Sequence, residues 1–243
     1  MAKNTASASP AASRTGAARR PAPRQRRSVR REAAVNAAFQ LAEREGASGL
    51  TMRRLAQELD VDVSILYRLF RDKDELVLAL CERTIEIELD DIGDVPEDED
   101  WQDTLRRIAE VTWTYQTRFP AITLLSFART TGGPAEHRMV ELLLSVFARA
   151  GLPPAEAVLF YRTFIDTALG LCAHSASLSL LAPEDREKDD SAWRRVYSHL
   201  PEREYPATAR HIDDLASLTQ KAIYTSAVEA VLAAAAHAAE LPR

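Results

Sequence analysis

The stretch "LTMRRLAQELDVDVSILYRLFRDKDEL", residues 50–76, gives the first indication of the fold. It holds two short amphipathic segments on either side of a polar break, "DVD" at residues 60–62. Thr51 is a good N-cap for the first segment, because its hydroxyl can accept a hydrogen bond from a backbone N–H at the start of a helix. The apolar positions of that segment recur at helical spacing: Met52, Leu55, Ala56 and Leu59. The pattern predicts a helix that ends at the break.

A second short helix is expected after the break, from Val63 or Ser64 to Phe70. Leu66 and Phe70 share one side of it, which we expect to face the protein interior. Two helices that are joined by a tight turn, each packing one face on a preceding helix, form a helix-turn-helix. In DNA-binding proteins the second helix of such a pair enters the major groove with its free face.

The free face of the predicted second helix carries side chains that suit DNA. They are Val63, Ser64, Ile65, Tyr67 and Arg68. Arg68 could bind a guanine or a phosphate, and the hydroxyls of Ser64 and Tyr67 could contact phosphates or base edges. Val63 and Ile65 could meet thymine methyl groups. We therefore predict DNA binding; the alternative is that this short helix is an ordinary part of a small helical domain.

Helices are also expected on both sides of the pair. Residues 29–45 show helical spacing before Gly46, which supplies a left-handed stop. The positions on that helix face are Ala34, Ala38, Leu41 and Glu45. After the pair, Asp72 and Glu75 have the spacing of a capping box, and the helix that they start runs through residues 75–89.

The same stretch resembles the DNA-binding segment of TetR-type one-component repressors. That segment has a Thr-initiated helix, a Gly-Val turn, a Leu-Tyr-x-x-Phe recognition helix and a Lys-x-x-Leu start to the next helix. The matching positions are Thr51, Val61, Leu66, Tyr67, Phe70, Lys73 and Leu76. The resemblance covers residues 29–80 and extends weakly to "AGLPPAEAVLFYRTFIDTALG" and "IYTSAVEAVLAAAA", which are similar to the family's dimerisation helices. It implies a repressor that binds double-stranded operator DNA and a small-molecule effector.

The resemblance also implies roles for individual residues. Phosphate contacts fall on Thr51, Arg53, Tyr67 and Lys73. The residues nearest the bases are Val63, Ser64, Ile65 and Arg68. Asp60 replaces the customary turn glycine, which Asp tolerates because it enters the left-handed region more readily than most residues. Leu69 stands where the family often has a histidine that contacts the DNA backbone.

The composition indicates an all-α protein. The chain has 243 residues, of which 46% are apolar and 28% charged, with 8 glycines and no strand-like runs of Val, Ile and Thr. Cys81 and Cys172 lack the spacing of a zinc or redox pair, so we expect both to be buried in a reducing compartment. We also expect no signal peptide and no apolar run of membrane-spanning length, and hence a cytoplasmic location.

Positive charge is concentrated at the front of the chain. Residues 1–31 carry nine Lys and Arg side chains and no acid. Residues 1–80 have 15 basic and 9 acidic side chains, whereas the remainder has 16 basic and 27 acidic. This asymmetry predicts that the N-terminal end meets a polyanion. Residues 1–27 are expected to be a disordered basic tail, which either adds phosphate contacts that compensate for Leu69 or only increases solubility.

An acidic segment at residues 90–100 precedes a second helical region. We therefore place a DNA-binding domain at residues 28–80 and a ligand-binding and dimerisation domain at residues 81–243. The first helix of the second region ends before Pro120, and its apolar side is Trp101, Leu105, Ile108, Thr112, Tyr115 and Phe119. Further helices are expected over "AITLLSFAR", "AEHRMVELLLSVFARAG" and the residues from Pro154 to about Leu178.

The last part of the chain is expected to hold a loop and a dimerisation helix. Residues 181–206 are polar and predict a mobile loop with at most one helical turn, and a helix then runs from about Ala207 or Leu218 to Ala239. Its stripe of small residues predicts a homodimer interface: Ile223, Ala227, Ala230, Ala234 and Ala238, with Val231 beside them. The preceding long helix would supply the other half through Phe160, Phe164, Thr167 and Leu171. The alternative is that the alanine face packs inside its own subunit.

A small-molecule site is predicted from aromatic and histidine side chains of the second region. The candidate lining residues are Trp113, Tyr115, Phe127, Phe160, Tyr161, Phe164, His174 and Trp193. The alternative for each of them is an ordinary core position. His137 and Glu141 could face one metal ion, but an exposed hydrogen-bonded pair is the favoured interpretation, so we predict no metal and no cofactor.

The sequence holds no recognisable catalytic motif. Its five histidines lie near no Ser, Cys or Asp in a nucleophile arrangement, and it has no phosphate-binding glycine loop and no HExxH. We therefore predict no enzyme but a ligand-responsive transcriptional regulator that binds an inverted-repeat operator as a homodimer. An all-helical enzyme or an adaptor protein that does not bind DNA is the alternative, which a sequence-dependent DNA shift would distinguish.

Overall fold

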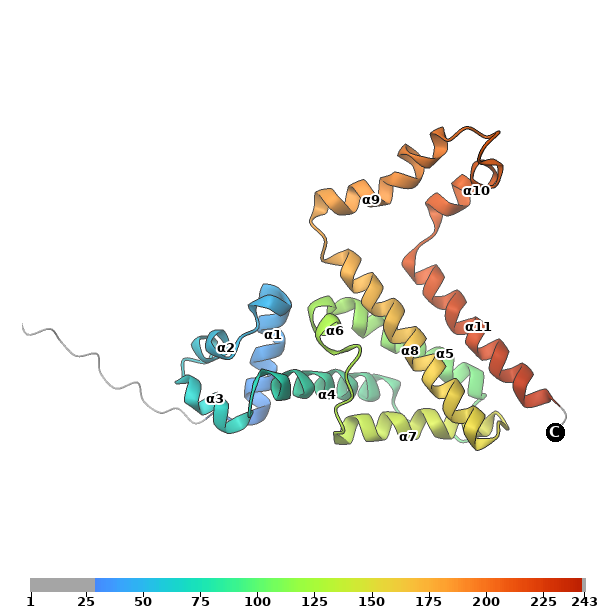
Figure 1. The fold of residues 1–243 in the computed structure, drawn as a ribbon. Helices are drawn as coiled ribbons and strands as arrows, with labels where there is room; N and C mark the ends of the chain where they lie inside the picture. The colour runs from blue at the N-terminus through green and yellow to red at the C-terminus, as the bar shows by residue number, and fades with distance from the viewer. Residues whose placement is uncertain (1–28, 242–243) are drawn as a thin grey trace, which may run out of the picture.

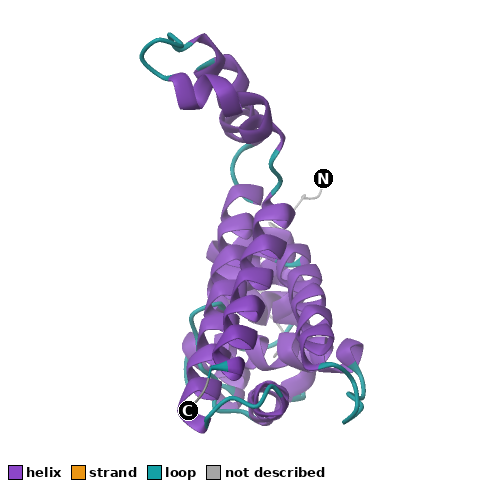
Figure 2. Ribbon diagram, turned by 90° about the vertical axis from the view of Figure 1, so that its right-hand side faces the viewer, coloured by secondary structure: helices purple, strands orange, loops and turns teal. Residues whose placement is uncertain are grey.

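The computed structural model describes residues 29–241. Over that range it contains eleven α-helices, one short 3-10 helix and no strand, which confirms the all-α prediction (Figure 2). The elements are α1 (Arg31–Gly49), α2 (Met52–Glu58), α3 (Val63–Leu69), α4 (Lys73–Ile92), α5 (Trp101–Arg118), α6 (Pro120–Ser126), α7 (Pro134–Arg149), α8 (Pro154–Ser179), α9 (Pro183–Arg195), η1 (Tyr197–His199), α10 (Pro206–Ser217) and α11 (Gln220–Glu240). The predicted basic tail, residues 1–27, lies outside the described residues.

The first three helices form a group at one end of the molecule (Figure 1). Thr51 Oγ1 accepts a hydrogen bond from the backbone N–H of Arg54 (3.1 Å), and Asp62 Oδ1 accepts one from that of Ser64 (2.9 Å). Asp60 has a φ of 51°, the left-handed conformation expected of the residue that replaces the turn glycine. These caps and this turn end α2 and start α3 within a few residues, so the predicted helix-turn-helix is confirmed.

Helix α4 begins at the predicted cap and leaves the first group. Asp72 Oδ1 accepts a hydrogen bond from the backbone N–H of Glu75 (2.9 Å). The Glu75 carboxylate reaches back to the N–H of Arg71 (2.8 Å) rather than to that of the cap residue. The helix is 20 residues long and runs from the helix-turn-helix group into the rest of the molecule (Figure 1). The domain boundary expected after residue 80 falls inside this helix.

Two hydrophobic cores divide the molecule. The N-terminal core contains Leu41, Leu55, Leu66, Phe70, Leu76 and Leu80, and it also receives Ile122 from α6. The C-terminal core is built by α5, α7, α8 and α11 around Leu105, Ile108, Leu143, Phe147, Phe164 and Tyr224. Inside it, the hydroxyl of Tyr224 donates a hydrogen bond to the carbonyl of Ala109 (2.7 Å), which satisfies a polar group that the core would otherwise leave unpaired. Cys81 and Cys172 are buried, as expected.

The predicted loop at residues 181–206 is wrong, because this segment is largely helical. Helices α9 and α10, with η1 between them, form an arm that projects from the bundle between the ends of α8 and α11 (Figures 1 and 2). No residue of the two helices is buried, although Trp193 packs against Tyr197 with ring centroids 4.8 Å apart. The sequence pattern lacked an apolar stripe here, but α9 has the charge signals of a helix: acids in its first turn and arginines in its last.

Helix α11 begins at Gln220, and Thr219 caps it by accepting a hydrogen bond from the N–H of Ala222 (3.1 Å). By length and composition α11 could span a membrane, contrary to the expectation of no apolar run of that length. The pair formed by α8 and residues 183–199 passes the same test although it is bent by 115°. Four residues of α11 are nevertheless buried against the bundle: Tyr224, Val228, Leu232 and Ala235. The opposite face of the helix is exposed.

The turn between α2 and α3 generates a stability prediction. Because Asp60 has a positive φ, Asp60→Gly should raise the free energy of unfolding by about 0.5–1 kcal/mol. Asp60→Val should lower it by about 1–2 kcal/mol, since a β-branched side chain strains this conformation. Urea denaturation measures both changes. Equal stability of the two variants would show that the turn does not require a left-handed residue.

Candidate nucleic-acid interface and effector cavity

Helix α3 presents its outer face to solvent at the end of the helix-turn-helix group. Ser64 and Arg68 are exposed, Tyr67 is 53% exposed, and Val63 is half-buried. The cap at Asp62 and the packing of α3 on α2 fix the direction of this face. The structure therefore brings together the hydroxyl, phenol and guanidinium that were predicted to meet DNA.

The prediction is wrong for Ile65, which was expected on the free face. Its side chain is only 6% exposed and belongs to the N-terminal core, beside Leu66. Consecutive helical residues point about 100° apart, and the apolar stripe of a packed helix is at least that wide. A short helix that rests on a neighbouring helix can therefore bury two consecutive side chains, so Ile65 positions α3 and does not reach a base.

The arginines near α3 divide into paired and unpaired groups. Arg54 forms ion pairs with Glu45 (2.6 Å) and Glu58 (3.0 Å), and its hydrogen bonds lower the pKa of Glu45. This guanidinium therefore ties α1 to α2. Arg53 and Arg68, in contrast, are exposed and form no ion pair with any other residue that the structure describes. They can bind phosphates or bases without first breaking an internal pair.

Two further predicted phosphate contacts also lie at the surface. Thr51 is exposed, and its hydroxyl proton is available because its oxygen acts as the acceptor in the cap of α2. Lys73 is half-buried in the first turn of α4. A phosphate at this position would also meet the unsatisfied N–H groups of the helix start.

A cavity of about 410 Å³ lies in the second part of the molecule. Its wall is formed by α4, α7 and α8, with Gln116 of α5 and the end of α6. Ile85, Met139 and Leu143 give it apolar surface, and Phe127 stands among its lining residues. A volume in this range suits a small organic molecule.

Of the eight predicted lining residues, Phe127 and Tyr161 line this cavity. The structure corrects the prediction for the other six. Three of them pack against other rings: Trp113 against Tyr224 (ring centroids 4.7 Å apart), Phe164 against Phe147 (6.0 Å) and Tyr115 against Phe119 (6.5 Å). Phe160 packs against the C-terminal core. His174 is exposed, and Trp193 lies on the arm. Most of these rings face the core, whereas the cavity lies on the side of α8 that faces α4 and α7.

The most unusual group in the cavity wall is Glu88, a residue that was not predicted to line a site. Its side chain is 4% exposed, and burial raises the pKa of its carboxyl to about 7 although hydrogen bonds from Gln116 and Thr112 act in the opposite direction. Gln116 Nε2 donates to Glu88 Oε1 (2.8 Å), and Thr112 Oγ1 lies 3.5 Å from Oε2. The residue was missed because the acidic run around it is typical of a solvated helix face.

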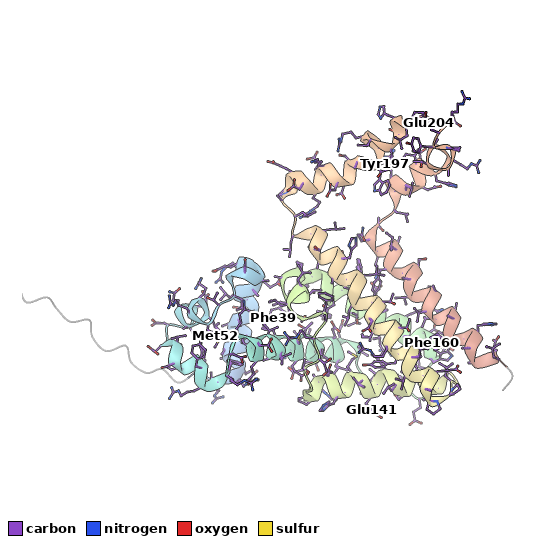
Figure 3. The ribbon with its side chains drawn as sticks, in the orientation of Figure 1. Phe39, Met52, Glu141, Phe160, Tyr197 and Glu204 are labelled. Atoms are coloured by element: carbon purple, nitrogen blue, oxygen red, sulfur yellow. The ribbon has the colours of Figure 1, made fainter. Side chains whose placement is uncertain are left out.

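Two arginines line the cavity, and each is already paired. Arg129 forms two hydrogen bonds with Asp74 (2.7 and 2.8 Å), which lower the pKa of that carboxyl. Arg162 forms two with Asp166 (2.8 and 2.9 Å). His137 and Glu141 are both exposed on α7, where Figure 3 labels Glu141. The described residues hold no group of three or more possible metal ligands.

The chain matches two family models. The model for "Bacterial regulatory proteins, tetR family" matches residues 34–80, and that for "Tetracyclin repressor-like, C-terminal domain" matches residues 95–234. Among solved structures, apo ActR from Streptomyces coelicolor has a TM-score of 0.77 at 18% identity, covering 88% of this chain and 97% of that one. ActR in complex with actinorhodin has a TM-score of 0.76 at 19% identity, covering 88% and 99%. These structures share the fold.

Curated relatives match over part of their length. HTH-type transcriptional repressor DrrR1 of Streptomyces coeruleorubidus is 32% identical over 124 residues, which is 51% of this chain and 45% of that protein. HTH-type transcriptional repressor Rv1353c of Mycobacterium tuberculosis is 29% identical over 142 residues, 57% and 54% of the two chains. The chain thus spans about half the length of these relatives. Because the two family models together cover the helix-turn-helix and most of the second helical region, the chain belongs to the tetR family of bacterial regulatory proteins.

Proposed function

We propose that this protein is a ligand-responsive transcriptional regulator, acting as a repressor, that binds an inverted-repeat operator as a homodimer in the cytoplasm. The observation that carries the proposal is the outer face of α3. Ser64, Tyr67 and Arg68 lie exposed together on a helix that two caps and a buried core hold in place. Hydroxyl and guanidinium groups on a rigid helix are what base and phosphate recognition in a major groove requires.

A ligand in the cavity could influence α3 through two contacts. On one side, the loop after α6 reaches the start of α4 through the Arg129–Asp74 pair, and Arg129 also lines the cavity. On the other side, α6 packs on α1, and Phe39 of α1 meets Phe119, the residue before α6, edge to face with ring centroids 4.8 Å apart. A ligand that shifts α4 or α6 would therefore move the helix-turn-helix group. The solved complex of ActR with actinorhodin supports a ligand site in this fold.

The homodimer proposal rests on the outer face of α11. Ala230 and Ala234 are exposed and Ile223 is 38% exposed, whereas Ala227 and Ala238 are half-buried and Ala238 packs against the C-terminal core. The predicted face therefore packs partly inside its own subunit and leaves Ala230 and Ala234 for a partner. Small residues allow two helices to approach closely. An apolar helix face that remains uncovered in one subunit is typical of a surface that a partner buries.

The part of the interface predicted on α8 needs correction. Phe164 is 1% exposed and lies in the C-terminal core, so the stripe that it shares with Phe160 and Leu171 faces inward. The outer face of α8 instead carries Leu159, which is 61% exposed, together with Thr163 and His174. Because α8 and α11 pack side by side (Figure 1), these two outer faces can form a four-helix interface with a second copy.

The proposed reading helix can be tested by substitution. On an operator selected from random DNA, Arg68→Ala should weaken binding by about 1–3 kcal/mol if the guanidinium reads a base, and by less if it holds a phosphate. Tyr67→Phe should weaken specific and non-specific binding alike. Arg83→Ala on α4 removes one positive charge elsewhere and serves as the matched control. Fluorescence anisotropy that gives wild-type affinity for both α3 variants would contradict the proposal.

The proposed dimer is tested by charge on α11. Ala230→Glu with Ala234→Glu should give a folded monomer, because two carboxylates per helix cannot be buried unpaired, and operator affinity should collapse. Ser145→Glu with Ala148→Glu places the same charges on exposed positions of α7 and should leave the dimer intact. Sedimentation velocity distinguishes the two species. An unchanged dimer in the α11 variant would place the interface on another surface.

A further inference from the structure

The cavity holds an acidic group without a cationic partner. Glu88 is fully buried in the wall, and its two hydrogen bonds come from the neutral side chains of Gln116 and Thr112. No Lys, Arg or His in residues 29–241 forms an ion pair with it. A buried carboxylate that only neutral donors satisfy keeps most of its desolvation cost, and a cation beside it would remove that cost.

The other charged residues that line the cavity do not give it a net positive charge that would attract an anion. The positive charges of Arg129 and Arg162 are each balanced by an ion pair, with Asp74 and Asp166 respectively. Glu136, a third lining carboxylate beside Glu88 and Asp166, accepts hydrogen bonds from the N–H of Gly132 (2.6 Å) and from Thr131 (3.2 Å) and holds the loop before α7. The cavity therefore has more negative than positive charge. Acids outnumber bases among its lining residues. Of these acids, Glu88 and Glu136 form no ion pair with a described residue, and Glu88 is the buried one of the two.

The rest of the wall suits a lipophilic molecule. Ile85, Met139 and Leu143 are apolar, and the aromatic rings of Phe127 and Tyr161 also line the space. Aromatic faces attract cations, most strongly where water is excluded. Resting on the proposed function, we infer that the effector of this regulator is a lipophilic monocation, such as a protonated amine attached to an apolar body, whose charge is bound by Glu88.

The position of Gln116 supports this assignment. Its amide nitrogen donates to Glu88, while its amide oxygen lies 2.9 Å from Thr123 Oγ1 on α6. The carboxylate of Glu88 is thus connected through one side chain to the helix that packs on the helix-turn-helix group. A cation that draws Glu88 toward the cavity would act on α5 and α6 at once.

The experiment uses two probes of the same shape and opposite charge, tetraphenylphosphonium and tetraphenylborate. Each is titrated calorimetrically into the 243-residue protein in sodium buffer at pH 8 without DNA. The cation should bind at least tenfold more tightly than the anion. Glu88→Gln should weaken cation binding at least tenfold and leave anion binding unchanged or stronger. Glu86→Gln, on the same helix but outside this cavity, should change neither. Thermal unfolding should show that Glu88→Gln is folded, because the amide fills the same space.

A pH series gives an independent measurement. Cation binding should strengthen as the pH rises through about 7, because Glu88 must lose its proton to bind a positive charge. Cys172 on α8 and Tyr224 on α11 interact electrostatically with Glu88. Both stay neutral around pH 7, because burial raises the pKa of Cys172 to about 12 and also raises the pKa of Tyr224. Burial likewise raises the pKa of Cys81 in the wall to about 11, while Arg129, Glu136, Tyr161, Arg162 and Asp166 are the other titratable lining residues. Glu88→Gln should abolish this dependence.

Three results would overturn the inference. They are equal or preferred binding of the anion, a Glu88→Gln variant that binds the cation as the wild type does, and absence of cation binding altogether. Because these titrations contain no DNA, they are independent of the proposed function. A protein that binds the cation through Glu88 but never selects a DNA sequence would refute the regulator and leave the cation site standing.

Discussion

The structure depends on one helix that is buried at both ends. Leu76 and Leu80, near the start of α4, belong to the N-terminal core. Ile92, the last residue of α4, belongs to the C-terminal core. Burying a Leu or Ile side chain stabilises the folded protein by about 1.5–3 kcal/mol, so moving either end of α4 out of its core would cost that energy. Between these anchors α4 supplies Glu88 to the cavity wall. Any change that a ligand imposes on α4 must therefore be accommodated by the helix-turn-helix group.

Local signals predicted the first half of the fold well. Thr51, Asp62 and Asp72 cap their helices through hydrogen bonds to the backbone within three residues, and such contacts depend on short stretches of sequence. The left-handed Asp60 follows from the same kind of local chemistry. The arm of α9 and α10 was missed because its helices pack no stripe against the bundle, so the periodicity that identifies buried helices is absent.

The sites were predictable only where exposure follows from helix geometry. Tyr67 and Arg68 are exposed on α3 as expected, but Ile65 is buried because α3 rests on its neighbours with a wide face. The cavity depends on how α4, α7 and α8 cross, which no spacing along one helix reveals. For that reason Trp113 and Phe164 were assigned to a ligand site although they fill the core, and Glu88 was overlooked. The signal that could have identified it is its spacing from Cys81 and Thr84, since all three share one buried side of α4.

In the proposed regulator, α3 of two subunits reads DNA together. Selection of binding sites from a random DNA library by the 243-residue protein, followed by sequencing of the enriched pool, tests this directly. We expect one enriched inverted repeat whose half-sites are centred about 34 Å, or a multiple of that distance, apart along the helix axis. A pool without enrichment, or an enriched site without twofold symmetry, would contradict it.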